Sequence, residues 1–389
     1  MTRARVYLDW NATSPLLPAA RDALVDALDA FGNPSSIHGE GRRARAIVEG
    51  ARAHVAALCG VAPAGVTFTS GGTEAANLAL TPNFVRVGEK PCDLLFISAG
   101  EHACVLDGHR FPPNAVRIVP LTTDGVVDLC ALAAMLEQAG DARVMLALQA
   151  ANNETGAIQP VREAAALVHA RGGVLVCDAV QAAGRMDIRA QSLDADAIIL
   201  SAHKIGGAKG AGALAVRAPD TNINMRMVRG GGQERNLRAG TENVSGIAAF
   251  GVAAEWALRS CESETHRLAV LRDALEERIV RALPDLTIFS GATPRLANTS
   301  AFAVADAPAE TLLMGLDLEG FAVSSGSACS SGKVKASHVL AAMGVAPDMA
   351  SCAVRVSLGR DTTEADVMGF ANAFLRVASR MTDRRKSAA

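Results

Sequence analysis

The sequence predicts an α/β protein with a large domain built on a mainly parallel sheet covered by helices, followed by a smaller α+β domain. Two observations carry this prediction. Between about residues 60 and 217, short β-rich apolar runs alternate with helical patterns, as they do in parallel sheets with helical crossovers. After residue 255 the pattern changes to a long helix, a few strands and a final helix. With 389 residues, 50% of them hydrophobic, the chain is long enough for two domains.

Each element follows from its local pattern. Helical spacing runs through residues 18–31 and 42–58, and the turn-rich segment 32–39 between them is interpreted as an active-site loop. The strands of the sheet are expected at residues 66–69, 94–98, 116–120, 144–148, 174–177, 197–200 and 212–216. Beyond them we expect a helix at 264–283, strands at 298–304 and 353–358, and a final helix at 364–381.

These elements suggest where the domains divide. We expect the large domain at residues 14–255 and the small domain at residues 1–13 and 256–382. The small domain would carry a serine- and glycine-rich loop at 321–337. Residues 383–389 are expected to form a flexible tail, as chain ends commonly do.

Composition argues against several classes of protein. The net charge of -2 and the absence of a basic block among aromatics argue against nucleic-acid binding. No apolar stretch reaches membrane-spanning length and no signal peptide is evident, so we expect no membrane association and a cytoplasmic location. The 8 cysteines include no C-x-x-C pair, which predicts neither a metal site nor a disulfide framework.

Two polar residues stand where predicted strands end. Lys204 follows the apolar run 197–200 and precedes the glycine-rich stretch 206–212, while Asp178 ends the run 174–177. The carboxyl ends of parallel strands form the ligand-binding edge of such a sheet. Desolvation disfavours the charged form of a lysine and so favours the neutral amine that attacks carbonyl groups. Either residue alone is more often an ordinary loop residue or helix cap, but the pair matches the needs of pyridoxal 5'-phosphate (PLP), namely an amine and an acid for the ring nitrogen.

Three further strand ends carry side chains suited to the same ligand. After 66–69, two glycines lead into a helical pattern at Thr73, where free N–H groups and the hydroxyl suit a phosphate; an ordinary N-capped turn is the alternative. His102 follows 94–98 and suits stacking on a flat ring, although a lone histidine is more often solvated or a cap. Asn153 follows 144–148 and offers an amide for a ring hydroxyl, although asparagine-rich turns are common there.

Two residues of the small domain indicate how a substrate is handled. Cys329 stands in a serine- and glycine-rich segment near Lys333 and Lys335, which favour the nucleophilic thiolate; an incidental surface cysteine is the alternative. Arg355 lies in a predicted strand and suits bidentate binding of a carboxylate, with Arg360 as a rival candidate. Together these residues indicate an amino-acid substrate.

On these motifs the sequence resembles the cysteine desulfurases, fold-type I PLP enzymes, and specifically their class with a long cysteine loop. The resemblance spans nearly the whole chain and rests on segments 8–13, 32–36, 70–74, 152–154, 178–181, 201–204, 238–241 and 324–329. Trp10 and Ala208 depart from the residues usual in the family, and they leave the subgroup open, whether general iron–sulfur assembly or nitrogenase-dedicated.

The resemblance implies a role for each residue near the coenzyme. Lys204 is expected to bind PLP covalently, Asp178 to hold its ring nitrogen, and His102 to stack over the ring and move protons. Gln181 and Asn153 are expected near the ring oxygen. The implied phosphate cradle consists of Gly72, Thr73, Ser201 and His203, joined by Thr241 of the partner subunit in a homodimer. The implied substrate carboxylate site consists of Arg355, Asn153 and Asn33.

The implied reaction converts L-cysteine to L-alanine. The sulfur becomes a persulfide on Cys329 and passes to an iron–sulfur scaffold or another acceptor protein. Two alternatives stay open: a selenocysteine lyase or related PLP-dependent aminotransferase, neither of which requires Cys329, and a catalytically silent docking protein.

Overall fold

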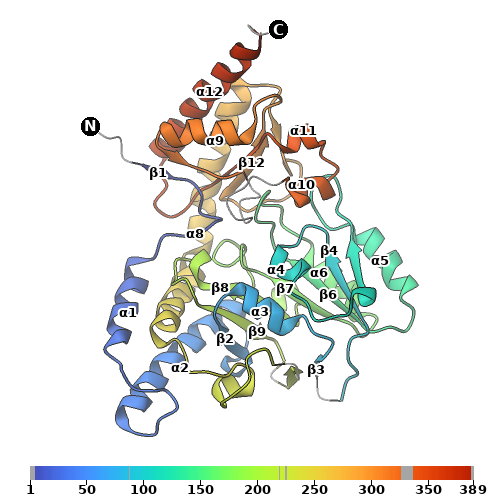
Figure 1. The fold of residues 1–389 in the computed structure, drawn as a ribbon, viewed down its shortest axis with the longest axis vertical. Coiled ribbons are helices and arrows are strands. Elements are labelled where there is room, and N and C mark those ends of the chain that lie inside the picture. Colours follow the sequence, from blue (N-terminus) through green and yellow to red (C-terminus); the bar gives the residue numbers. More distant parts are fainter. Residues whose placement is uncertain (1–4, 87, 219, 224–225, 326–335, 387–389) are drawn as a thin grey trace.

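The computed structural model describes residues 5–86, 88–218, 220–223, 226–325 and 336–386 (Figure 1). The predicted nucleophile Cys329 lies outside these described residues. Within them the α/β architecture expected from the sequence is present, with a large sheet and helices in one part and a smaller sheet in the other (Figure 1).

The large sheet has seven strands and is mainly parallel. Their spatial order is β2 (Val66–Thr69), β9 (Gly212–Val216), β8 (Ala197–Ser201), β7 (Val174–Asp178), β6 (Val144–Gln149), β4 (Leu94–Ser98) and β5 (Val116–Val119). Strand β9 runs antiparallel to both of its neighbours, and the strands from β8 to β5 are parallel. The carboxyl ends of these parallel strands therefore lie along one edge of the sheet.

Helices bury both faces of this sheet. Along β6, Leu146 and Leu148 pack into one core with α2 (Gly39–Cys59), α6 (Val161–His169) and the first part of α8 (Val244–Ala282). The alternate residues Met145 and Ala147 pack into a second core with α3 (Gly72–Ala79). This double burial explains why the strands are continuous apolar runs. The remaining elements here are α1 (Pro18–Leu28), α4 (Ala103–Leu106), α5 (Leu129–Gln138), α7 (Ala190–Leu193), β3 (Phe84–Arg86) and β10 (Thr221–Ile223).

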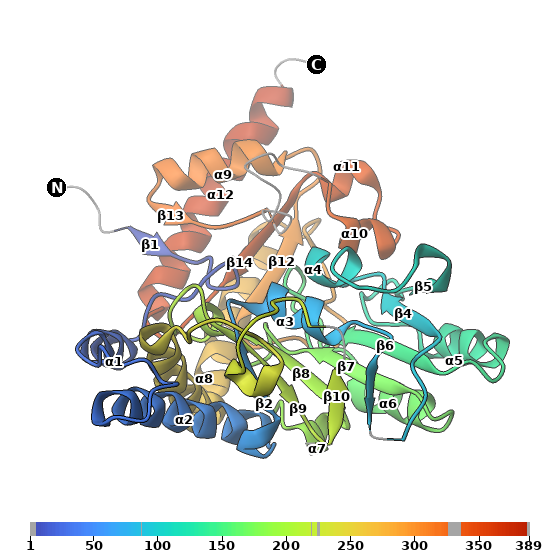
Figure 2. The same cartoon turned by 60° about the horizontal axis from the view of Figure 1, so that its bottom comes forward.

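The smaller part is built on an antiparallel sheet of β11 (Thr287–Ile288), β12 (Thr299–Ala303) and β14 (Ala353–Ser357). Four helices accompany it: α9 (Ala309–Leu318), α10 (His338–Ala342), α11 (Pro347–Ala350) and α12 (Glu364–Lys386). Near the N-terminus, β1 (Val6–Tyr7) pairs in parallel with β13 (Phe321–Ala322). In Figure 2, β12 and β14 lie above α3, and Gly72 of α3 and Arg355 of β14 line the same cavity.

Two helices extend beyond their predicted ends. Helix α8 begins at Val244 rather than at residue 264, because its first part, rich in alanine, is buried nearly all round and shows no amphipathic period. Helix α12 continues to Lys386, into the segment 383–389 for which the sequence predicts a flexible tail.

Helix α8 contributes to the cores of both parts of the molecule. Residues from Ile247 to Ala257 join the core of the large sheet, and Leu268, Leu275 and Ile279 join that of the small sheet. The proposed domain boundary at residues 255 and 256 thus lies inside this helix, which runs from the lower to the upper part of Figure 1. None of the helices in the described part of the chain combines the length and the apolar character needed to span a bilayer.

Candidate active site

A cavity of about 310 Å³ opens where β4, β6, β7 and β8 end. The structure brings most of the predicted site residues together in its lining: Gly72, Thr73, His102, Asn153, Asp178, Gln181, Ser201, His203, Lys204 and Arg355. They come from segments more than 280 residues apart in the chain, so their convergence is a property of the fold.

Three predicted site residues are not part of this lining. Asn33 is exposed, and its side-chain oxygen accepts a hydrogen bond from the Ser35 N–H at 2.9 Å. Thr241 is also exposed and lies between Gly240 and Glu242, which line a different, smaller cavity. Cys329 lies outside the described residues. The substrate role of Asn33 therefore has no support within a single chain, whereas Thr241 was expected to act only on a partner subunit.

Lys204 is held against the cavity wall by two backbone carbonyls. It ends the short 3-10 turn Ala202–Lys204 that follows β8, and its Nζ donates to the Asn11 carbonyl at 2.6 Å and to the Ala12 carbonyl at 2.9 Å. Asn11 is completely buried, and its side-chain nitrogen donates to the Asn153 carbonyl at 3.2 Å. Asn11 lies in the segment 8–13, which contributes to the family resemblance but from which no role for Asn11 is predicted.

Two buried carboxyl groups adjoin the cavity, and burial raises the pKa of both. Asp178 accepts a hydrogen bond from the Val180 N–H at 2.9 Å. Burial raises the pKa of Asp178, and the smaller effects of this hydrogen bond and of the charges of His102 and Lys204 lower it. Glu101 is fully buried and accepts from the Gln149 N–H at 2.7 Å, while its Oε2 has no partner among the described residues. Burial and the nearby charge of Asp178 raise the pKa of Glu101 well above its ordinary value.

His102 is oriented by a cap. As the N-cap of α4 it accepts a hydrogen bond at Nδ1 from the Cys104 N–H at 3.1 Å. Because that nitrogen accepts, the proton of the neutral imidazole is on Nε2.

The N-terminus of α3 forms one end of the cavity. The first N–H groups of a helix lack acceptors within the helix and favour an anion. A Cβ atom on Gly72 would lie 3.1 Å from a methyl group of Val180 and 3.5 Å from the Cβ of Ser201, so glycine lets the helix start close to β7 and β8. Burial and the charges of Lys204 and Lys209 lower the pKa of His203 to about 4. The imidazole is therefore neutral at neutral pH and available for hydrogen bonding.

Arg355 occupies the other end. One terminal nitrogen donates to the Asn153 carbonyl at 2.8 Å and the other to Asp9 at 2.7 Å. Its Nε is buried without an acceptor among the described residues, which suits a bound carboxylate. The rival Arg360 donates instead to the carbonyls of Pro15 and Leu16 and does not line this cavity.

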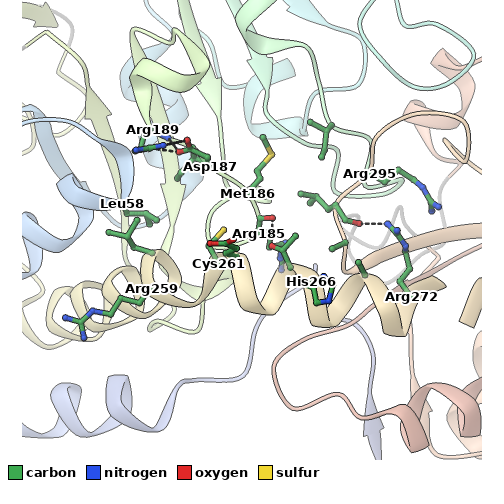
Figure 3. A pocket seen from close by; sticks show the side chains of 18 residues that line it. Leu58, Arg185, Met186, Asp187, Arg189, Arg259, Cys261, His266, Arg272 and Arg295 are labelled. Carbon is green, nitrogen blue, oxygen red and sulfur yellow. Dashed lines mark hydrogen bonds and ion pairs between the residues drawn. The ribbon is translucent and has the colours of Figure 1, made fainter. Parts of the chain in front are cut away.

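Two further hollows lie near Lys204. A small cavity of about 40 Å³ is lined by Lys204, Arg185, Trp10 and Trp256 among others. A larger groove of about 830 Å³ runs between α8 and the segment from Arg185 to Arg189, and Figure 3 shows its side chains. Arg185 lines both hollows and therefore separates the groove from the surroundings of Lys204.

Comparison with known proteins identifies the class. The family profile "Aminotransferase class-V" matches residues 6–370. A cysteine desulfurase of Cereibacter sphaeroides is 40% identical and the alignment covers 93% of each chain; "Cysteine desulfurase IscS" of Dictyoglomus turgidum is 36% identical over 94% of this chain and 92% of its own. The structure of a NifS-like protein from Rickettsia africae superposes with a TM-score of 0.86 at 32% identity, covering 96% of this chain and 99% of that one. The chain belongs to the class-V aminotransferase family and, within it, to the PLP-dependent cysteine desulfurases.

The cavity fits PLP in size and chemistry. Its volume of about 310 Å³ lies in the range of small-molecule sites. It offers a carboxylate for the ring nitrogen at Asp178, an amine for the aldehyde at Lys204 and a helix N-terminus for the phosphate at Gly72. The predicted fold class and coenzyme are thus confirmed by the family, and the roles of single residues are part of the proposal below.

Proposed function

We propose that this enzyme uses the cavity at Lys204 to remove the sulfur atom from L-cysteine and release L-alanine. The observation that carries the proposal is the joint lining of one cavity by the Lys204 amine, the Asp178 carboxyl group and Arg355, whose Nε has no acceptor in the part of the chain that the structure describes. An amino acid needs this combination, because its amine reacts with the coenzyme while its carboxylate needs a cation.

The chain supplies a partner for each part of the coenzyme. PLP, when bound, supplies an aldehyde that joins amines and a ring that withdraws electrons from the carbon beside them. Asp178 would keep a proton on the ring nitrogen, and the N-terminus of α3, with Thr73, Ser201 and His203, would hold the phosphate. Gln181 and Asn153 would face the ring oxygen, and His102 would cover the ring.

The substrate is oriented by Arg355, which would bind its carboxylate through Nε, and Lys204 would move the proton at its α-carbon. Cys329 would accept the sulfur: the carbon–sulfur bond of the substrate breaks and a sulfur–sulfur bond forms on the Cys329 thiol. L-cysteine and the thiol together contain the atoms and electrons of L-alanine and the persulfide, so no external oxidant or reductant is required.

The described ends of the cysteine segment support this choice of nucleophile. Ser324 and Arg355 exchange two backbone hydrogen bonds, of 3.2 and 2.6 Å, so the segment leaves the sheet beside the carboxylate site. On its far side, the Ser337 hydroxyl donates to Glu154, the neighbour of Asn153. Cys329 follows Ser324 by only five residues in the sequence, and five residues of chain reach at most about 17 Å.

We also propose that the enzyme is a homodimer and hands its sulfur to an iron–sulfur scaffold or another acceptor protein. The exposed Thr241 would complete the phosphate site of the partner subunit, since it contributes nothing to the cavity of its own chain. Sedimentation equilibrium of the purified enzyme tests the dimer, and a monomer at assay concentration would contradict it.

The function is tested by measuring alanine and protein-bound persulfide from L-cysteine with the PLP-loaded enzyme. Lys204→Ala should lose the visible absorption of bound coenzyme and all alanine formation. Cys329→Ala should keep the coenzyme but form no persulfide, and Cys130→Ala, which removes an exposed cysteine, should behave as the wild type. Full sulfide release by Cys329→Ala would refute the assigned nucleophile, and retained turnover of L-selenocysteine by that variant would favour a selenocysteine lyase.

A further inference from the structure

Arg185 is a partly buried cation whose hydrogen-bond acceptors are neutral groups. Its Nη1 atom donates to the backbone oxygen of Gln181 at 2.9 Å and to the side-chain Oε1 of the same residue at 2.6 Å. Its Nη2 atom donates to the Trp10 carbonyl at 3.4 Å. Within the part of the chain that the structure describes, no carboxylate forms an ion pair with it. Even a partly buried guanidinium loses hydration, and here neutral acceptors rather than an anion replace the lost water, so its placement calls for a reason.

The position of Arg185 is fixed by its own backbone as well. Its carbonyl oxygen accepts a hydrogen bond from the Thr265 hydroxyl of α8 at 2.9 Å. Figure 3 shows Arg185 at the wall of the large groove, which Cys261 of α8 also lines. Burial and the charge of Arg355 lower the pKa of Arg185 to about 10, and it therefore stays protonated at neutral pH.

This cation determines which way the Gln181 amide points. A guanidinium has only donors, so the atom of Gln181 that faces it must be the oxygen. The amide nitrogen is then left for the other side, where it donates to the Asn11 carbonyl at 3.0 Å. The same carbonyl accepts from Lys204 Nζ at 2.6 Å. Three hydrogen bonds thus connect Arg185 to the amine of Lys204.

We propose that Arg185 is a positioning residue that fixes the Gln181 amide and favours negative charge on the coenzyme oxygen that Gln181 faces. The inference rests on the proposed function, because it assumes PLP in the cavity. A positive charge behind the amide stabilises an anionic ring oxygen and disfavours a proton shared between that oxygen and the Lys204 nitrogen. Removing the charge should therefore raise the pH at which the bound coenzyme loses that proton.

The test is a pH titration of the visible absorption of the PLP-loaded enzyme. Arg185→Met should raise the midpoint by up to roughly one pH unit, the lower end of what a charge within about 4–6 Å produces, because three hydrogen bonds lie between Arg185 and Lys204. The matched control is Arg189→Met, which removes the same charge four residues further along, where Asp187 pairs with it at the surface. The control should titrate as the wild type. The other charged groups that line the cavities next to Lys204 are common to both variants: His102, Asp178, His203, Glu264, Arg355 and Arg360. The charged groups that line the groove with Arg185, apart from Arg189 itself, are also common to both: Asp187, Arg259, Glu262, His266, Arg272 and Arg295.

Two further variants keep the test decisive. Arg185→Lys retains the positive charge but loses the second terminal nitrogen of the guanidinium group, and a smaller upward shift of the midpoint is expected. This variant replaces Arg185→Met if the methionine variant does not fold. Gln181→Leu should abolish the difference in titration midpoint between arginine and lysine at position 185, because the proposed effect depends on the Gln181 amide. An unchanged midpoint in Arg185→Met with coenzyme bound would overturn the inference. A wild-type protein that binds no PLP would instead overturn the proposed function.

Discussion

Replacing Arg355 by lysine should weaken productive binding of the substrate carboxylate. Arg355 donates to Asp9 and to the Asn153 carbonyl with its two terminal nitrogens, and its third donor, Nε, has no acceptor among the described residues. A lysine at position 355 keeps the charge, but its single nitrogen would have to donate to Asp9, to the Asn153 carbonyl and to the substrate carboxylate. Loss of one hydrogen bond to a charged group costs about 1.5–3 kcal/mol. This corresponds to a decrease in kcat/KM of about 10- to 150-fold.

The assay is steady-state alanine formation over a range of L-cysteine concentrations. We expect most of the change in KM, with an unchanged absorption spectrum of bound PLP and an unchanged thermal unfolding midpoint. Arg360→Lys is the control, since Arg360 binds backbone carbonyls away from the cavity, and its kcat/KM should stay within about twofold of the wild type. A kcat/KM of Arg355→Lys within twofold of the wild type, or a larger loss in the control, would refute the assignment.

Three further predictions concern stability and coenzyme binding. Glu234 accepts hydrogen bonds from both terminal nitrogens of Arg52, at 2.7 and 2.8 Å, and both residues are buried. Glu234→Gln breaks this ion pair and should lower the free energy of unfolding in urea by about 3–5 kcal/mol. An unchanged urea midpoint would contradict this. The pKa of His203 is about 4 in the folded protein, below the ordinary 6.5. Because the unfolded chain therefore binds the proton at a higher pH, the coenzyme-free protein should lose stability as the pH falls from 6.5 to 4. His203→Gln should reduce this loss of stability. Gly72→Ala places a Cβ 3.1 Å from a neighbouring methyl group and should weaken PLP binding by about tenfold in an equilibrium titration, whereas Gly71→Ala, whose Cβ meets open space, should not.

Much of the fold follows from local patterns in the sequence. Strands that are buried on both faces are short apolar runs in the sequence. All seven strands of the large sheet begin and end within about two residues of the predicted positions. The site is predictable for the same reason, because residues that directly follow parallel strands must meet at one edge. Lys204, Asp178 and His102 were found in this way, and the structure brings them to one cavity.

What the sequence misses depends on contacts between distant segments. Asn11 joins the site only because the N-terminal segment crosses to the end of β8, and nothing local marks its carbonyl as the acceptor for Lys204. Glu101 precedes a predicted site residue, but its raised pKa depends on burial that only the packed structure produces. The start of α8 was missed because a helix buried all round has no amphipathic period.

The small cavity beside Lys204 has an optical consequence. The chain contains two tryptophans, Trp10 and Trp256, and both line this hollow; the single tyrosine, Tyr7, lies 6.2 Å from the ring of Trp10. Ultraviolet-excited emission of the unlabelled protein therefore originates next to the reactive amine rather than from the molecule at large. Any chromophore that settles there and absorbs in the near ultraviolet will quench that emission by energy transfer, so occupancy can be followed in real time without a dye.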